Sequence, residues 1–417
     1  MNIIIPDIDQ LIVSLAELPI LVKLGCVSKY FYELVSKQLI VKQWLIIKNM
    51  CGKKSINEIF IETCRYGFLL YGMFLVKKKQ IKIDIHYRNE YPFQSGCISG
   101  HIEIANWLFQ LGESRNYDKI DIHADSEYAF AHSCINGHIE IARWLIHLGE
   151  SGEYGKINIH IDHEYAFRWS CSNGHIEITR WLIHLGESGE YGKINIHIDT
   201  EQAFRCSCSN GYIEIARWLI HLGESEEYGK INIHAANEQA LIWSCSNGHI
   251  EIARWLIHLG ESEDYGKINI HTDDEYAFRC SCENGYIETA RWLIRLGESP
   301  DYSKINIDAC DEYAFKWSCK NGHIEIASWL IHLGEFGNYG KINIHVDDEH
   351  AFRWSCKNGH IEIANWLIHL GESENYKKIN IHANREYAFR WSCKNGHIEI
   401  ANWLIHLGEA GDYGKIN

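Results

Sequence analysis

One segment of this sequence returns with a fixed period of 37 residues, and this periodicity constrains the fold more than any other feature. Each copy contains a glycine, usually within Asn-Gly-His-Ile-Glu, and the spacing between these glycines never changes. They are Gly100, Gly137, Gly174, Gly211, Gly248, Gly285, Gly322, Gly359 and Gly396. Such self-similarity indicates a stacked array of one supersecondary unit, in which each copy buries its apolar face against its neighbours.

The copy at residues 157–191 illustrates the first half of the predicted unit. A short extended piece and the tip of a turn occupy residues 157–163, and residues 164–172 form a first helix. Asn173 and Gly174 tolerate positive φ and therefore end that helix. The residue before the first helix is of an N-cap type in most copies, namely Ser126, Thr200, Asn237, Asp274, Asp311 and Asp348.

The second half of the unit is predicted to be an antiparallel helix over residues 175–185. Gly186 stands where a C′ glycine ends a helix. Glu177, Arg180 and His184 follow one another at spacings of three and four and predict a solvent-exposed stripe. The unit is therefore a turn, a helix, a tight loop and a second helix.

This unit resembles an ankyrin repeat. The opening of the family motif is matched by residues 165–171, its Asn-Gly-His-x-Glu by residues 173–177, and its Leu-Leu-x-x-Gly by residues 181–186. The family repeat has about 33 residues, and most of the surplus lies in residues 187–192, where we expect a longer projecting loop. The resemblance implies an all-α solenoid of helix–loop–helix units.

The chain is predicted to contain three parts. Residues 87–417 hold nine ankyrin-type repeats of 37 residues. A degenerate copy without the longer loop precedes them at residues 51–86 and would cap the array. Residues 1–50 do not follow the repeat, and their short amphipathic stretches predict a small helical head.

The head resembles an F-box. The family's Leu-Pro-x-Glu-Leu start and its central Val-Cys-Lys-x-Phe-Tyr motif are matched by residues 5–12 and 26–31. This resemblance implies docking to the adaptor subunit of a cullin-based ubiquitin ligase. The residues that would make the contact are Pro6, Ile8, Leu11, Ile12, Val27 and Phe31. The alternative is that the head only caps the open end of the stack.

Composition restricts the partners. The net charge of −15 argues against nucleic acid, which requires a basic face. No apolar run reaches the roughly 18 residues of a membrane span, and the N-terminus lacks the basic region of a secretory signal.

Nine of the 15 cysteines lie in register from Cys97 to Cys393. Because stacked helices are about 8–10 Å apart and a disulfide needs Cα atoms within about 7 Å, we expect reduced thiols inside a cell.

The repeated polar residues have structural interpretations that outweigh chemical ones. Cys134 and His138 have a spacing that could ligate zinc, but they flank a helix-breaking Asn-Gly, so His138 is expected to begin the second helix and to bond a neighbouring repeat. Glu140 and its equivalents suit the positive end of a helix dipole better than acid catalysis. The tryptophans in register with Trp144 are expected to pack between repeats. We therefore expect no enzyme, cofactor or metal.

In the ankyrin family, turn tips and first-helix surfaces line a concave binding face. A second tryptophan register on the first helix suits interface anchors, and three lysines make the last third of this face basic. The candidate residues are His132, His163, Trp169, Trp243, Trp317, Lys320, Trp354, Lys357, Arg385, Trp391 and Lys394. The alternative is that the variation between copies reflects neutral drift at solvent-exposed positions.

The last repeat is almost identical to an internal one, so Ala401, Trp403 and Leu404 are expected to face water without a polar cap. We expect this end to be frayed or covered by a partner or by a second copy of the chain.

Together, these resemblances imply a substrate-recruiting adaptor for a host cullin-type ubiquitin ligase, which would bind the ligase adaptor subunit and a host target protein. The alternatives are a binding scaffold or decoy without a ubiquitin link, and a structural component that polymerises through its end. The near-identical repeats and the Ile-, Asn-, Lys- and Tyr-rich composition resemble ankyrin repeat proteins of giant amoeba-infecting, mimivirus-like viruses. That resemblance implies a location in the host cytoplasm or nucleus.

Overall fold

The computed structural model describes residues 38–47, 49, 54–78, 82–114, 116–409 and 413–416. These residues form helices joined by turns and loops, and none of them lies in a strand, which confirms the all-α fold expected from the sequence. No helix within these ranges is both long and apolar enough to cross a membrane. The chain divides into two compact units, Met1–Ile198 and Asp199–Asn417.

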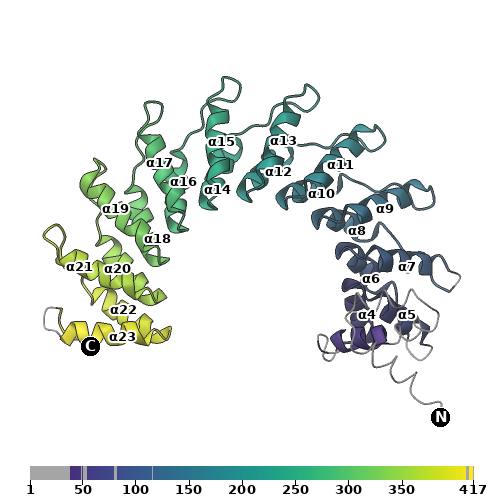
Figure 1. The fold of residues 1–417 in the computed structure, drawn as a ribbon, viewed down its shortest axis with the longest axis horizontal. Coiled ribbons are helices and arrows are strands. Elements are labelled where there is room, and N and C mark those ends of the chain that lie inside the picture. Colours follow the sequence, from purple (N-terminus) through teal and green to yellow (C-terminus); the bar gives the residue numbers. More distant parts are fainter. Residues whose placement is uncertain are drawn as a thin grey trace, which may run out of the picture. The chain divides into compact units, whose positions relative to one another are not determined.

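Each repeat contributes a first and a second helix, which form a hairpin (Figure 1). Within each unit, the first helices of successive repeats pack against one another. The first helices are α6 (Tyr87–Ile98), α8 (Ala124–Ile135), α10 (Ile161–Ser172), α12 (Ile198–Ser209), α14 (Ala235–Ser246), α16 (Thr272–Glu283), α18 (Ala309–Lys320), α20 (Val346–Asn358) and α22 (Ala383–Lys394). The second helices are α7 (Ile102–Gly112), α9 (Ile139–Glu150), α11 (Ile176–Glu187), α13 (Ile213–Gly223), α15 (Ile250–Gly260), α17 (Ile287–Gly297), α19 (Ile324–Phe336), α21 (Ile361–Glu372) and α23 (Ile398–Glu409).

Small side chains allow the first helices to approach closely. On α8, Ala129, Ser133 and Cys134 are buried together with Phe130. The Ser133 hydroxyl donates to the carbonyl of Ala129 (2.7 Å) and lies 3.3 Å from the carbonyl of Cys97 on α6. This satisfied hydroxyl links two repeats without leaving an unpaired polar atom in the core. Equivalent contacts recur in the second unit at Ser244, Ser281, Ser355 and Ser392.

The tryptophans of the second helices pack between repeats, as expected. The ring of Trp144 on α9 lies 6.1 Å from that of Phe93 on α6, and Trp403 on α23 lies 6.3 Å from Phe352 on α20. These phenylalanines are fully buried. The exposed stripe predicted on the second helix is also confirmed, because Glu177, Arg180 and His184 are all exposed.

The turn before each first helix differs from the expected N-cap. At the start of α10, Asp162, His163 and Glu164 are not helical and adopt left-handed φ values of 44°, 58° and 61°. An N-cap residue, in contrast, has an extended backbone. The left-handed conformation is costly for residues with a Cβ, and side chains offset the cost. His160 Nδ1 lies 2.8 Å from Glu164 Oε1, while the Arg168 guanidinium donates to the carbonyls of His163 (2.6 Å) and Asp162 (2.8 Å).

The glutamate of this turn is buried and joins neighbouring repeats. Glu127 is 6% exposed, and its Oε1 accepts a hydrogen bond from the backbone amide of Asn158 in the next repeat (3.0 Å). His123 lies beside it, with Nδ1 2.8 Å from Glu127 Oε1 and Nε2 donating to the carbonyl of Tyr154 (2.9 Å). Burial alone would lower the pKa of His123, but the Glu127 carboxylate and the Tyr154 carbonyl raise it above its ordinary value.

The turn histidine donates to the carbonyl of the loop tyrosine in the next repeat only where a glycine follows that tyrosine. His234 Nε2 donates to Tyr265 O (2.8 Å) where Gly266 follows with φ 78°. In the loop that follows His271 the glycine is replaced by Ser303, and in the loop that follows His345 it is replaced by Lys377. The Nε2 atoms of these two histidines have no hydrogen-bond partner among the described residues. Since side chains other than glycine rarely adopt positive φ, this one substitution removes an inter-repeat hydrogen bond.

Two glycines of the repeat have different roles. Gly174 has φ 84° and ends α10 as predicted, while Asn173 keeps a negative φ and its Nδ2 donates to the Ile135 carbonyl of the preceding repeat (2.9 Å). Gly186 was expected to terminate the second helix, but α11 continues to Glu187. A Cβ on Gly186 would lie 2.7 Å from the carbonyl oxygen of Gly192. The glycine is needed because the returning loop contacts the helix backbone.

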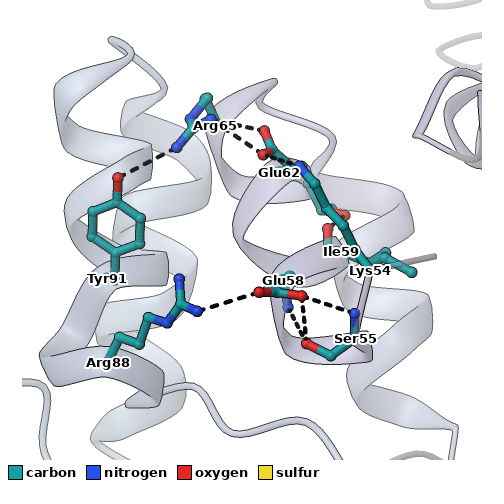
Figure 2. Close-up of polar contacts among 9 residues, drawn as sticks. Lys54, Ser55, Glu58, Ile59, Glu62, Arg65, Arg88 and Tyr91 are labelled. Carbon is teal, nitrogen blue, oxygen red and sulfur yellow. Dashed lines mark hydrogen bonds and ion pairs between the residues drawn. The ribbon is translucent and has the colours of Figure 1, made fainter. Parts of the chain in front are cut away.

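The degenerate copy forms α4 (Ile56–Arg65) and α5 (Leu69–Lys77). A capping box between Ser55 and Glu58 begins α4. Figure 2 shows how α4 is tied to α6: Arg88 donates to Glu58 (3.2 Å), and Arg65 donates to the hydroxyl of Tyr91 (3.4 Å). These contacts place the degenerate copy against the first regular repeat.

The last repeat exposes residues other than those predicted. Ala401 is 7% exposed and Leu404 is fully buried, because both face the rest of the array. The residues left open are Ile398 (70% exposed) and Ile405 (37%). The equivalent of Ile405 in the preceding repeat, Ile368, is covered by the repeat that follows it and is only 2% exposed.

Candidate functional site

The solvent-accessible face of the last three first helices carries paired aromatic side chains. Each helix contributes two rings spaced four residues apart, so both lie on one face. Tyr313 and Trp317 on α18 stack with centroids 5.2 Å apart. The series continues through His350 and Trp354 on α20, with 6.4 Å between the rings of Trp317 and His350, to Tyr387 and Trp391 on α22.

Two lysines lie between these tryptophans, and a third lies beside the last one. Lys320 Nζ is 3.3 Å from the Trp317 ring centroid and 4.7 Å from that of Trp354. Lys357 Nζ is 3.7 Å from Trp354 and 4.3 Å from Trp391, and Lys394 Nζ is 4.1 Å from Trp391. Such cation–π contacts favour the observed positions of the ammonium groups. We refer to Trp317, Lys320, Trp354, Lys357, Trp391 and Lys394 as the aromatic–lysine ladder.

The electrostatic environment of the ladder is basic at its centre. Burial, together with the positive charges of Lys316 and Arg353, lowers the pKa of His350 to about 4, so its imidazole is neutral at pH 7. Burial also lowers the pKa of Lys320; the charge of Glu283 opposes this shift, and the charge of Lys357 adds to it. Like charges held near each other in a partly desolvated surface favour an anion nearby.

The first ring of each aromatic pair is not among the residues predicted from the sequence. These rings belong to Tyr313, His350 and Tyr387, which directly follow the turn glutamate and precede the predicted tryptophan by four residues. Their one-turn spacing from Trp317, Trp354 and Trp391 was the signal that could have found them, since residues four apart on a helix are neighbours.

The other predicted binding residues do not join the ladder. In the first unit, His132 on α8 lies between the rings of Tyr128 (4.0 Å) and Tyr165 (5.9 Å), and Trp169 on α10 is 38% exposed. Trp243 on α14 is half-buried, with a guanidinium 5.9 Å from its ring. His163 and Arg385 are exposed, but they lie in the left-handed turns at the start of α10 and α22.

The predicted contact residues of the head lie outside the described part of the chain. They are Pro6, Ile8, Leu11, Ile12, Val27 and Phe31.

Cys134 and His138 occupy the positions expected of packing residues. Burial raises the pKa of the Cys134 thiol far above its usual range. His138 is the residue before α9, its imidazole packs against Gly100, and a hydrogen bond connects it to the backbone of Ile98 in the preceding repeat. Among the residues that the structure describes, no three His, Cys, Asp or Glu side chains group as metal ligands.

Comparison with known proteins points to one family. The family model "Ankyrin repeats (3 copies)" matches residues 97–193, 130–232, 168–269, 204–304 and 279–378. No curated protein matches the chain. The crystal structure of the human ASB11 ankyrin repeat domain is similar at 15% sequence identity, over 54% of this chain and 96% of that one, with a TM-score of 0.34. Ankyrin repeats indicate a scaffold for protein–protein interaction, and the fold is typically non-enzymatic. Because the matched segments span most of its length, this chain belongs to the ankyrin repeat family.

Proposed function

We propose that this chain is an adaptor that brings a target protein to a cullin-type ubiquitin ligase of a host cell. The observation that carries the target-binding half is the aromatic–lysine ladder, in which three half-buried tryptophans lie on one face. Tryptophans in such settings often dominate binding energy because they bury a large area at little entropic cost. The chain would supply binding, and the ligase would supply the chemistry.

The ligase-binding half is supported by the F-box-like residues of the head, Pro6, Ile8, Leu11, Ile12, Val27 and Phe31. The resemblance to ankyrin repeat proteins of giant amoeba-infecting viruses supports the part of the proposal that the adaptor acts in the cytoplasm or nucleus of an infected host cell. A scaffold or decoy without a ligase would share the ladder but not the head contact.

Calorimetric titration of the full chain with the purified ligase adaptor subunit tests this proposal. We expect binding, and we expect its loss in the double variant Leu11→Asp/Phe31→Asp, because charged groups at a buried contact stay unpaired. Ile398→Asp at the exposed face of the last repeat is the matched control and should bind normally. Absence of binding by the unmodified chain would rule out the ligase link and leave the scaffold or decoy.

Self-association through the last repeat stays a prediction. The residues on which it was based are mostly buried, and Ile398 and Ile405 now define the face to be tested. Light scattering of the full chain at increasing concentration measures it directly.

A further inference from the structure

Several lysines of the array form ion pairs, whereas the three lysines of the ladder form none with the described residues. Lys156, Lys230 and Lys316 each pair with a carboxylate of a following repeat. Among the described residues, no carboxylate lies within ion-pair distance of Lys320, Lys357 or Lys394; the hydrogen bond that Lys357 Nζ makes is to the hydroxyl of Tyr387 (3.3 Å). Although the chain has a net charge of −15, none of these three cations forms an ion pair with a described carboxylate.

The nearest carboxylate is already engaged. Glu283 favours the charged form of Lys320, but its Oε2 accepts a hydrogen bond from the Tyr313 hydroxyl (2.7 Å). Burial of that hydroxyl and the bond to Glu283 raise the pKa of Tyr313, so the phenol remains protonated and keeps the carboxylate occupied. The ladder therefore presents three ammonium groups whose donors are largely unused.

The cations and rings alternate along the surface. Lys320 lies between Trp317 and Trp354, and Lys357 lies between Trp354 and Trp391, so each step of one repeat offers one ammonium group and one apolar ring. A chain crossing the three helices would meet this pair once per repeat. Carboxylates of that chain would offset the repulsion between the lysines, and its methylene groups would pack against the parts of the rings that the lysines leave open.

From this arrangement we infer that the ladder binds an acidic peptide segment of the target protein, with carboxylates on Lys320, Lys357 and Lys394. The inference rests on the proposed target-binding role and specifies the chemistry of the target. A single-stranded nucleic acid fits less well, because base stacking needs open tryptophan faces and the ladder lysines already lie over those faces.

The test is fluorescence anisotropy of the full chain with a labelled peptide of alternating Glu and Ser. A Gln–Ser peptide of the same length and an oligothymidylate of the same net charge are the comparison probes. We expect the acidic peptide to bind and to weaken as salt is raised. We expect the triple variant Lys320→Gln/Lys357→Gln/Lys394→Gln to weaken it roughly tenfold, the sum of three partly exposed ion pairs.

The chain offers a matched control. Lys304, Lys341 and Lys378 in the loops of the same repeats also lie over aromatic rings, with Nζ 5.3, 4.3 and 5.4 Å from the centroids of Tyr339, Tyr376 and Tyr413. Changing these three to Gln alters the net charge equally and should change the affinity less than about twofold, as expected of distant surface charges. The triple Lys→Arg variant of the ladder keeps the charges and should retain binding.

Three results would overturn the inference: equal affinity for the acidic and Gln–Ser peptides, an equal loss in the loop control, or tighter binding of the oligothymidylate. Thermal unfolding shows whether each variant is folded, and the Lys→Arg variant gives an independent answer if the Gln variant is not. The outcome is separable from that of the ligase titration, which depends on the head rather than on the ladder.

Discussion

The backbone amide of Glu312 donates to the carbonyl of Asp308 (3.0 Å), so two acidic residues share a turn in which other repeats pair a histidine with the glutamate. In the adjoining repeats, His271 Nδ1 and His345 Nδ1 each lie 2.9 Å from the corresponding carboxylate. Glu312 is 6% exposed, and its Oε2 has no partner among the described atoms. Burial raises the pKa of Glu312 to about 7; the Asn343 amide opposes this shift and Asp308 adds to it.

Replacing Asp308 with histidine should change the pH dependence of stability. The folded pKa of Glu312 lies above its ordinary value of 4.5, so its contribution is fully present below about pH 4.5 and is lost as the pH rises to about 7. Asp308→His supplies the missing imidazole and should recover on the order of 1–3 kcal/mol at pH 8. Urea unfolding at pH 5 and pH 8 measures the difference. Asp274→His, at an exposed turn position of the preceding repeat, is the control. Parallel pH profiles for Asp308→His and the unmodified chain would contradict the expectation.

Gly266→Ala should disconnect His234 from the next repeat. The substitution strains a φ of 78° and turns the Tyr265 carbonyl away from His234 Nε2, at a combined cost of about 1–2 kcal/mol. The pKa of His234 is raised because its bonds to Glu238 and Tyr265 outweigh burial, so losing one of them should lower that pKa. Chemical denaturation and NMR titration of the imidazole measure the two effects. Ser303→Ala, at the equivalent position without a positive φ, should change neither.

Gly149→Ala should destabilise the array by overpacking. A Cβ at this position of α9 would lie 2.8 Å from the carbonyl oxygen of Gly155, and such close contacts typically cost about 1–3 kcal/mol. Ordinary helix propensity predicts the opposite, a gain of about 1 kcal/mol from replacing a helical glycine. Thermal unfolding therefore separates the two explanations by sign. His147→Ala on the exposed face of the same helix should have little effect.

Arg353→Met should loosen the left-handed turn before α20. This guanidinium is 7% exposed, donates to the carbonyls of Asp347 and Asp348, and lies over the ring of Tyr387 (4.9 Å). Its removal takes the charged donor away from these two turn carbonyls and from the partly buried contact with Tyr387, which costs about 1–3 kcal/mol. Hydrogen exchange of the turn amides and urea unfolding provide the measurement. Arg385→Met, at an exposed turn tip, is the charge-matched control; a similar loss there would show that charge rather than capping is responsible.

The sequence predicted those features of the fold that depend only on residues of the same repeat. The break at Gly174 and the exposed stripe Glu177, Arg180 and His184 were predicted correctly. The left-handed turn was not, because the burial of Glu127 depends on Asn158 in the next repeat, which no propensity of the turn residues encodes. The prediction that Gly186 ends the second helix was wrong for the same reason. The glycine is required by a carbonyl of the returning loop that lies close to it, and not by the end of the helix.

For the candidate site, the tryptophans and lysines of the first helices were better indicators of the surface than the variable turn residues. Trp317, Trp354 and Trp391 with their lysines assemble on one surface because they share a register on packed helices. His163 and Arg385 were chosen because they vary between copies, and variation alone does not bring a side chain onto that surface.

The buried turn glutamate gives the array a direction. Glu127 receives the amide of Asn158, Glu164 that of Asn195, and Glu238 that of Asn269, so the acceptor always belongs to the earlier copy and the donor to the later one. A ribosome releases the earlier copy first. We therefore expect each emerging turn to add to a carboxylate of the preceding copy, so that the stack grows in the order of synthesis.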